Sequence, residues 1–316
     1  MLTVLFATRN RADMLRHVLE SYRSLQAPPS GWKLVIVDNG STDSTAGTVG
    51  SFAKVLPIHF LTEPTPGKNA ALNAGLNHVE GDLVVFTDDD AFPRPDWLLQ
   101  LQAAADAQPE YSMFGGAIVA RWAKPPERWV AWVNQAAVFT ITEPSLKTGP
   151  LHPREIYGPN MAIRNSVFRL GIKFDTAIGP RGADYPMGSE TEMVLRLGRL
   201  GHKAWHVESA IVEHYIREEQ LHKDWVMKRG VRFGRGQYRL YSTANPETRL
   251  PPVPLTLWRK MLKQAALMGL ARMTFQEEMY FRANWRLSCF LGEAREARVL
   301  ARELSQARNP AERSAP

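Results

Sequence analysis

Three carboxylates stand side by side in FTDDDAF, residues 86–92, directly after the apolar run DLVVFT. Adjacent negative charges repel one another, so a positive partner is expected nearby. Hard divalent cations such as Mg²⁺ and Mn²⁺ prefer oxygen ligands and often combine one or two carboxylates with substrate phosphates. We therefore expect Asp88 and Asp90 to bind such an ion, while Asp89 turns aside or contacts a sugar hydroxyl. The alternative is an acidic turn that caps a helix beginning near Pro95.

Polar residues also follow three earlier apolar runs, in TRNR, VDNGSTD and PGKN. Asp38 is suited to accept hydrogen bonds from a nucleobase or ribose, although the same residues also form Asx-type turns. Lys68 would place a cation beside a phosphate at a helix N-terminus, where backbone N–H groups favour anions. A solvated lysine at the start of a helix is the alternative. Thr8 and Arg9 lie beside the end of the first run.

The elements that must position these residues follow from the apolar pattern. Short apolar runs at 2–8, 33–38, 58–61 and 82–87 predict buried strands, and helical patterns separate them, the first capped by Asn10. Strands that alternate with helices indicate βαβ units and a mostly parallel sheet. Ligands of such sheets bind beyond the carboxyl ends of the strands, where the polar residues stand. The sequence thus predicts an α/β fold with a nucleotide-type site.

The second half is more mixed. The patterns predict strands at 112–122, 203–207 and 211–216, an amphipathic helix over 125–139, and a strand that runs into a helix over 158–168. A helix over 188–201 should end at Gly201. From 218 onward the pattern is helical, with a break at 245–254, two or three helices over 255–307, and a frayed end.

These motifs together resemble glycosyltransferase family 2, with the GT-A fold. The resemblance rests on TRNRADML, IVDNGSTDST, GKNAALNAGL, FTDDDAFPRPDWL, GPNMAIRNSVFRLGIKFD, GSETEMVLRLGRLG and VEHYIREEQL, in the family's order over about residues 2–240. It implies a Rossmann-like mixed, mostly parallel sheet flanked by helices, with a helical C-terminal region. The implied domains are a catalytic domain at 1–240, with a nucleotide-sugar half (1–118) and an acceptor half (119–240), and a helical region at 241–316.

The resemblance implies inverting transfer of a sugar from a nucleotide-diphosphate sugar (UDP-, dTDP- or GDP-linked) to an acceptor hydroxyl on a glycan, polysaccharide or lipid-linked molecule. A divalent ion, Mn²⁺ or Mg²⁺, would stabilise the charge that develops on the leaving diphosphate. The implied metal ligands are Asp88, Asp90 and His214. The implied donor contacts are Thr8, Arg9, Arg11, Asp38, Lys68, Asn69, Asp88 and Asp89.

Inverting transfer also requires a general base for the acceptor proton. The family usually places a carboxylate in a GEDTEL-like element, and this chain reads GSETEM at 188–193. Glu190 stands where the family's aspartate does and extends the carboxylate by one methylene. We expect Glu190 to be the base, with Glu192 as the second candidate. The alternative is that both are first-turn residues that favour the helix dipole.

The composition indicates where the protein is located and what its C-terminal region contacts. The chain has 316 residues, is 44% hydrophobic and contains a single cysteine, which excludes an internal disulfide and is consistent with a reducing compartment. Neither a signal peptide nor a membrane-spanning run is expected, so the expected location is the cytoplasm. Residues 217–316 hold 19 Lys and Arg against 10 Asp and Glu. This charge favours peripheral contact with the inner face of the cell membrane, or a helical hairpin that packs on the catalytic domain or on a homodimer partner. No nucleic-acid motif accompanies it.

Two other functions fit parts of the sequence. A catalytically degenerate member of the fold that binds sugar or a partner would explain the altered GSETEM element. A sugar-phosphate nucleotidyltransferase would also use a nucleotide site on an α/β sheet, but ATRNRADM lacks the glycine-rich phosphate loop expected after the first strand.

Overall fold

The computed structural model describes residues 1–182, 184–244 and 253–308, which form two compact units. The first unit contains Met1–Ala123, Gln135–Gly182 and Ser189–Arg217. The second contains Lys124–Asn134, the described part of Ala183–Gly188, and the chain from Glu218 onward. The helical unit therefore takes in residues before 241, where we had placed the boundary.

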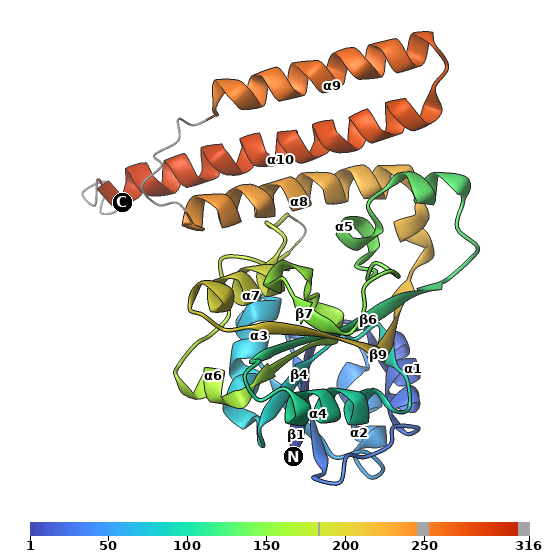
Figure 1. The fold of residues 1–316 in the computed structure, drawn as a ribbon, viewed down its shortest axis with the longest axis vertical. Coiled ribbons are helices and arrows are strands. Elements are labelled where there is room, and N and C mark those ends of the chain that lie inside the picture. Colours follow the sequence, from blue (N-terminus) through green and yellow to red (C-terminus); the bar gives the residue numbers. More distant parts are fainter. Residues whose placement is uncertain (183, 245–252, 309–316) are drawn as a thin grey trace. The chain divides into compact units, whose positions relative to one another are not determined.

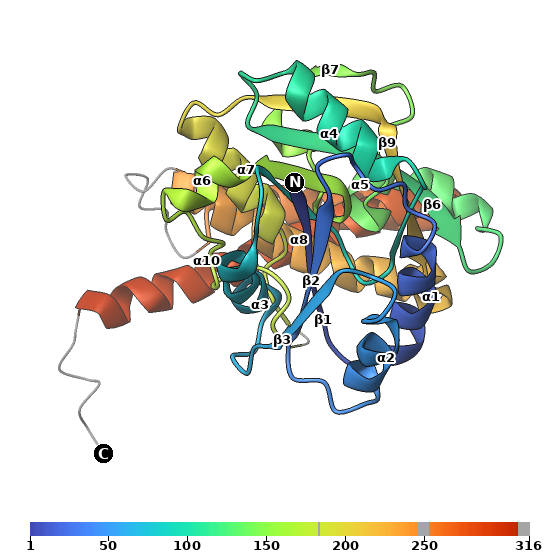
Figure 2. The ribbon, with the colours of Figure 1, turned by 90° about the horizontal axis from the view of Figure 1, so that it is seen from below.

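The first unit is built on one nine-stranded sheet, in the order β3-β2-β1-β4-β8-β6-β9-β5, with β7 paired to β9 (Figures 1 and 2). Strands β3, β2, β1 and β4 run parallel, and β8 is antiparallel to both β4 and β6. The strands are β1 Leu2–Thr8, β2 Trp32–Asp38, β3 Ile58–Thr62, β4 Leu83–Phe86, β5 Ala91–Pro93, β6 Met113–Trp122, β7 Gly149–Leu151, β8 Met161–Arg164 and β9 Ala204–Ile216. The expected mixed sheet with flanking helices is confirmed, but parallel pairings dominate only among β1 to β4, since β5, β7 and β8 pair antiparallel with their neighbours.

Helices cover both faces of this sheet. The helices are α1 Ala12–Tyr22, α2 Thr45–Phe52, α3 Lys68–Gly75, α4 Trp97–Ala107, α5 Gln135–Phe139, α6 Asn165–Arg169 and α7 Ser189–Arg199. Residues of β1 alternate between the faces: Val4 and Phe6 join the core under α1, α2 and α4, whereas Leu5 joins the core under α3, α6 and α7. Both faces are therefore buried, which explains the unbroken apolar runs.

Three local expectations were wrong. Asn10 does not cap α1: its Oδ1 accepts from the N–H of Thr42, and Asp43 accepts from the N–H of Ala12 instead. The expected helix over 125–139 is a 3₁₀ helix, Arg128–Trp132, followed by α5, because the chain turns extended at Val133. The expected strands 203–207 and 211–216 are one strand, β9, in which residues 208–210 have no partner on β6.

The second unit is helical. It contains Arg128–Trp132, the 3₁₀ helix Glu218–Leu221, and the long helices α8 Lys223–Ala244, α9 Leu255–Met273 and α10 Glu277–Arg308. Helix α10 lies between α8 and α9 (Figure 1). The expected helices over 255–307 are thus two, and most of the expected break and the expected frayed end lie outside the described residues. No helix in the described ranges is long and apolar enough to cross a bilayer.

Glycines and one buried acid join α8 to α10. A Cβ on Gly234 would lie 1.9 Å from the carbonyl oxygen of Cys289, and one on Gly292 would lie 2.0 Å from that of Val231. The two backbones can approach this closely only because both positions lack a side chain. The fully buried Glu296 accepts hydrogen bonds from two arginines of α8, Arg235 at 2.7 Å and Arg239 at 2.5 Å.

Candidate active site

The carboxyl ends of β1 and β2 meet at one edge of the sheet, where Thr8 pairs in register with Asp38. The three aspartates follow β4, the neighbour of β1. The hydroxyl of Thr8 donates to Oδ2 of Asp89 at 2.7 Å and so joins the end of β1 to the aspartate run. The expected convergence of polar residues at this edge is therefore present in the structure.

Lys68 lies between two of the predicted site carboxylates. Its Nζ is 2.5 Å from Oδ1 of Asp88 and 2.6 Å from Oε1 of Glu190. The lysine is the first residue of α3, preceded by Gly67 in the left-handed region with a φ of 132°. Burial opposes the charge of Lys68, but the two carboxylates outweigh it and raise its pKa. The single ammonium group of Lys68 thus pairs with the carboxylates of both Asp88 and Glu190.

The two carboxylates respond differently to this lysine. Burial raises the pKa of Asp88, and the attraction of Lys68 does not fully offset it because Glu190 and Asp90 add negative charge nearby. For Glu190 burial also favours the neutral acid, but Lys68 and the hydroxyl of Ser189 overcome it and lower the pKa. The surroundings of Glu190 therefore favour its ionised form.

Asp90, in the turn before β5, and His214, on β9, form a second pair. Nε2 of His214 is 3.5 Å from Oδ1 of Asp90, and Arg217 donates to Oδ2 of Asp90 at 3.2 Å. Burial acts against both charges, but their mutual attraction prevails: the pKa of Asp90 falls to about 2 and that of His214 rises. Asp89, the middle residue of the aspartate run, behaves oppositely, since burial and the neighbouring Asp90 raise its pKa to about 6.

Glu190 and Glu192 have different surroundings. Ser189 donates to Oε2 of Glu190 at 2.6 Å, and a Cβ on Gly158 would lie 2.7 Å from the same carboxylate, so this glycine leaves room for it. Glu192 instead accepts from Nε of Arg196 at 2.8 Å and is buried. The structure brings Glu190, and not Glu192, into contact with the other site residues.

The remaining predicted donor contacts are spread around the edge. Asp38 accepts from the N–H and the hydroxyl of Ser41, which is the Asx turn considered as its alternative role. The side-chain amide of Asn69 donates to the carbonyl oxygens of Asp175 and Ile178, so this residue holds a loop. Arg9 is exposed, whereas the charge of Arg11 acts on Asp89 and Asp90.

Asn39 is a residue that the sequence reasoning passed over. Its amide nitrogen donates to the carbonyls of Glu63 and Thr65, and its Oδ1 accepts from the N–H of Gly67 at 2.8 Å. These hydrogen bonds hold the loop at residues 63–67, which directly precedes Lys68. The signal was available, since a buried asparagine at the end of a strand needs partners for both ends of its amide.

The carboxylate oxygens and the imidazole at this edge are ligand types that suit a divalent cation. Nδ1 of His214 lies 2.8 Å from the carbonyl oxygen of Phe139 and donates its hydrogen there, which fixes the ring with Nε2 facing Asp90. A histidine fixed in this way is typical of metal ligands. Within the part of the chain that the structure describes, no three His, Cys, Asp or Glu side chains form a complete metal cluster. Substrate phosphates commonly complete such a ligand shell.

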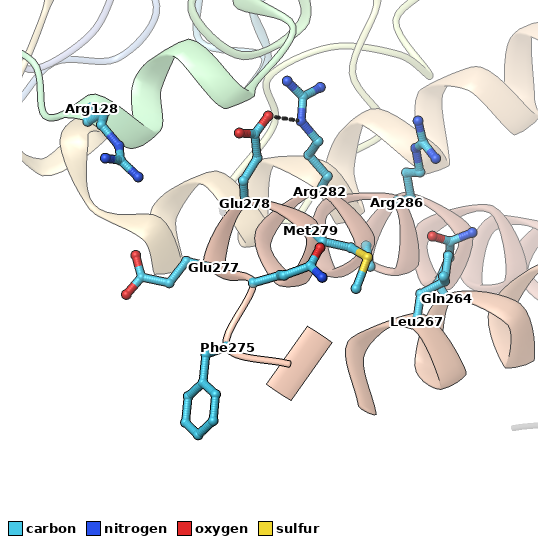
Figure 3. A pocket seen from close by; sticks show the side chains of 11 residues that line it. Arg128, Gln264, Leu267, Phe275, Glu277, Glu278, Met279, Arg282 and Arg286 are labelled. Carbon is cyan, nitrogen blue, oxygen red and sulfur yellow. Dashed lines mark hydrogen bonds and ion pairs between the residues drawn. The ribbon is translucent and has the colours of Figure 1, made fainter. Parts of the chain in front are cut away.

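A separate cavity of about 800 Å³ belongs to the helical unit alone (Figure 3). It is lined by Arg128 and by residues of α9, α10 and their connection, among them three arginines and two glutamates. Arg282 is paired with Glu278 at 2.8 Å, which leaves the cavity with nearly balanced charge. It therefore does not form a cation cluster of its own.

The carboxylates and the lysine lie at the carboxyl ends of the parallel strands, with His214 of β9 beside them, which is the edge where α/β sheets bind their ligands. The model of Glycosyl transferase family 2 matches residues 3–170, more than half of the chain, and the chain belongs to this family. The resemblance seen in the sequence is thereby confirmed. The match ends before α7 and β9, so Glu190 and His214 rest on the geometry described above.

Named relatives are glycosyltransferases. The chain is 25% identical over 207 residues to a glucosyl-dolichyl phosphate glucuronosyltransferase of Haloferax volcanii, an alignment that spans 62% of this chain and 63% of the relative. It is 29% identical over 97 residues to an undecaprenyl-phosphate 4-deoxy-4-formamido-L-arabinose transferase of Salmonella choleraesuis, covering 30% and 29%. The chain thus spans less than two thirds of the length of these relatives.

Solved structures show the same fold. The mannosyltransferase PcManGT of Pyrobaculum calidifontis, in complex with GDP-Man and Mn²⁺, has a TM-score of 0.64 at 18% identity, covering 95% of this chain and 87% of that one. TarS of S. aureus (residues 1–349) has a TM-score of 0.53 at 14% identity, covering 95% and 91%. The expected GT-A architecture is confirmed by these likenesses.

Proposed function

We propose that the chain is an inverting transferase that moves a sugar from a nucleoside-diphosphate sugar to a hydroxyl of a lipid-linked acceptor. The observation that carries the proposal is the placement of Lys68 between Asp88 and Glu190, which brings a donor-side carboxylate and a base-side carboxylate to one cation. The relative in Haloferax volcanii acts, by its name, on glucosyl-dolichyl phosphate, and PcManGT was solved with GDP-Man and Mn²⁺.

The donor would bind across the strand ends. Asp38 and Thr8 stand where a nucleoside is expected, and the charges of Arg11 and Lys68 suit a diphosphate. Asp88, Asp90 and His214 would hold Mn²⁺ or Mg²⁺, which when bound supplies Lewis-acid stabilisation of the departing diphosphate. Because Lys68 is fixed by its ion pairs, it presents positive charge to that leaving group without rearrangement.

Glu190 would remove the acceptor proton. Lys68 and Ser189 keep its carboxylate ionised, so it is ready to accept a proton at neutral pH. A hydroxyl nucleophile needs this base, whereas a phosphate nucleophile is already ionised and would be repelled by the carboxylate. We therefore propose a sugar hydroxyl of a lipid-linked glycan as the acceptor, rather than the lipid phosphate itself.

The altered GSETEM element does not favour the degenerate alternative, because the longer side chain of Glu190 reaches Lys68 at 2.6 Å. The family match likewise does not favour a nucleotidyltransferase. Since the acceptor is carried by a lipid, we propose that transfer takes place at a membrane surface, with the enzyme bound peripherally.

The test is a transfer assay with a panel of UDP-, dTDP- and GDP-sugars, with Mn²⁺, with Mg²⁺ and with chelator. Each donor is offered a polyprenyl phosphate and, in parallel, a polyprenyl-phosphate sugar. We expect metal-dependent transfer to the sugar-bearing acceptor only, read by mass spectrometry. Transfer to the bare polyprenyl phosphate would contradict the hydroxyl acceptor, and no transfer with any donor would contradict the enzymatic function.

A further inference from the structure

Helix α9 is apolar on two opposite faces, and only one of them is covered. Its inner residues Leu257 and Met261 pack with Ala294, Leu287 and Phe290 of α10. The residues at the opposite face follow the spacing of helical turns and are exposed: Leu255, Trp258, Leu262, Ala265, Gly269 and Met273. Within the part of the helical unit that the structure describes, α10 is the long helix that packs on α9, so the outer row meets solvent (Figure 1).

This outer row is too apolar for an ordinary surface. Leu262 is 67% exposed, and Phe275, in the turn after α9, is 92% exposed with a positive φ of 54°. In Figure 3 the ring of Phe275 points away from the neighbouring side chains of the cavity. Contiguous exposed apolar surface of this kind marks a contact with another molecule or with a membrane.

The charges on α9 identify the partner. The helix carries Arg259, Lys260, Lys263 and Arg272 and no acidic residue. Arg259 and Lys263 flank one side of the outer row and Arg272 flanks the other, by the spacing of 100° per residue. None of the four makes an ion pair with another residue in the described ranges, although Lys260 lies over the ring of Phe290 and Arg272 over that of Tyr280. A row of Leu and Trp bordered by cations is the pattern of a helix that lies in the interface of an anionic membrane.

A second copy of the chain fits this face poorly. Two such helices placed face to face would bring their arginines and lysines together, and like charges across an interface oppose association. An anionic lipid surface suits both the apolar row and the cations of α9. The row can insert among the acyl chains, and the cations can bind the anionic headgroups.

We propose that the outer face of α9, together with Phe275, binds the surface of a membrane rich in anionic lipid. This inference deepens the proposed function, on which its purpose rests, by naming the element that would hold the enzyme beside a lipid-linked acceptor. The binding itself requires neither donor nor acceptor.

The first experiment is flotation of the full chain with vesicles of phosphatidylcholine alone or of an equimolar mixture with phosphatidylglycerol, without substrates. We expect binding to the mixed vesicles that weakens with salt, and a loss of about tenfold or more in partitioning for Leu262→Glu. The matched control is Leu170→Glu, the same change at an exposed leucine of the first unit, which should bind like the wild type. Circular dichroism of both variants checks that they fold like the wild type. Failure of the wild type to bind, or equal loss in the control, would overturn the proposal.

A second experiment reads the contact at the residue itself. The native Cys289 is buried, so a cysteine introduced by Leu262→Cys can be labelled selectively with a polarity-sensitive dye. We expect a blue shift on mixed vesicles and none for a label introduced by Leu170→Cys. Light scattering without lipid gives the oligomeric state, and a dimer that Leu262→Glu dissociates would overturn the membrane role in favour of a second copy. Transfer to a detergent-dispersed acceptor is measured separately, so failure of lipid binding and failure of the enzymatic function are distinguishable.

Discussion

Nζ of Lys68 lies 2.6 Å from Oε1 of Glu190, although 122 residues separate them in the chain. The same Nζ lies 2.5 Å from Asp88. The lysine thus links the aspartate run after β4 to the first turn of α7, and it lowers the pKa of the residue proposed as the base.

Replacement of Glu190 by Gln should abolish transfer and spare donor binding. The amide keeps the shape of the side chain but cannot accept the acceptor proton, and loss of a general base typically costs about 10²–10⁴-fold in rate. Single-turnover transfer and calorimetric titration with the nucleoside diphosphate and Mn²⁺ measure the two quantities. Glu192→Gln is the matched control. It should lower stability, since it weakens the ion pair of the buried Glu192 with the half-buried Arg196, and leave the rate constant within about tenfold. A Glu190→Gln enzyme as fast as the wild type would exclude Glu190 as the base.

Replacement of Lys68 by Met should shift the pH dependence of transfer. In the folded protein Lys68 lowers the pKa of Glu190, with Ser189 assisting and Asp88 nearby. Removing the cation raises that pKa, so the base becomes protonated at a higher pH than in the wild type. The acid limb of the pH–rate profile should therefore move to higher pH, and Lys68→Arg should leave it nearer the wild-type position. An unmoved limb in Lys68→Met would show that the lysine does not set the ionisation of the base.

The parallel part of the sheet and its polar edge were predictable because they depend on local patterns. Continuous apolar runs gave β1 to β4, and the register of β1 with β2 then places Thr8 beside Asp38. The pairing of Lys68 with Glu190 was not predictable, because it depends on how loops far apart in the chain approach each other. The turn at Val133 was also missed, because Trp129 and Trp132 suit an α-helix and a 3₁₀ helix alike: both pack on Phe281.

Replacement of Gly234 by Ala should destabilise the helical unit. Its Cβ would lie 1.9 Å from the backbone carbonyl of Cys289, and such an overlap forces α8 and α10 apart, at a cost of about 1–3 kcal/mol or more. Gly269→Ala in α9 is the control, because a Cβ there meets nothing within 4 Å. It should stabilise the unit by roughly 0.5–1 kcal/mol through helix propensity. Thermal unfolding followed by circular dichroism compares the two, and equal melting temperatures would contradict the close approach of the helices.

Replacement of Glu293 by Gln should stabilise the protein at neutral pH. Burial raises the pKa of this carboxyl in the folded state, and Lys260 only partly opposes it. A raised pKa means that the stability contributed by the neutral acid is present at low pH and is lost as the pH rises through the folded-state value. The glutamine stays neutral throughout, so its melting temperature should exceed that of the wild type at pH 7–8 and match it in acid. Glu110→Gln, at an exposed position, should show no such pH-dependent gain. A Glu293→Gln gain that persisted unchanged into acid would mean that packing, and not ionisation, is responsible.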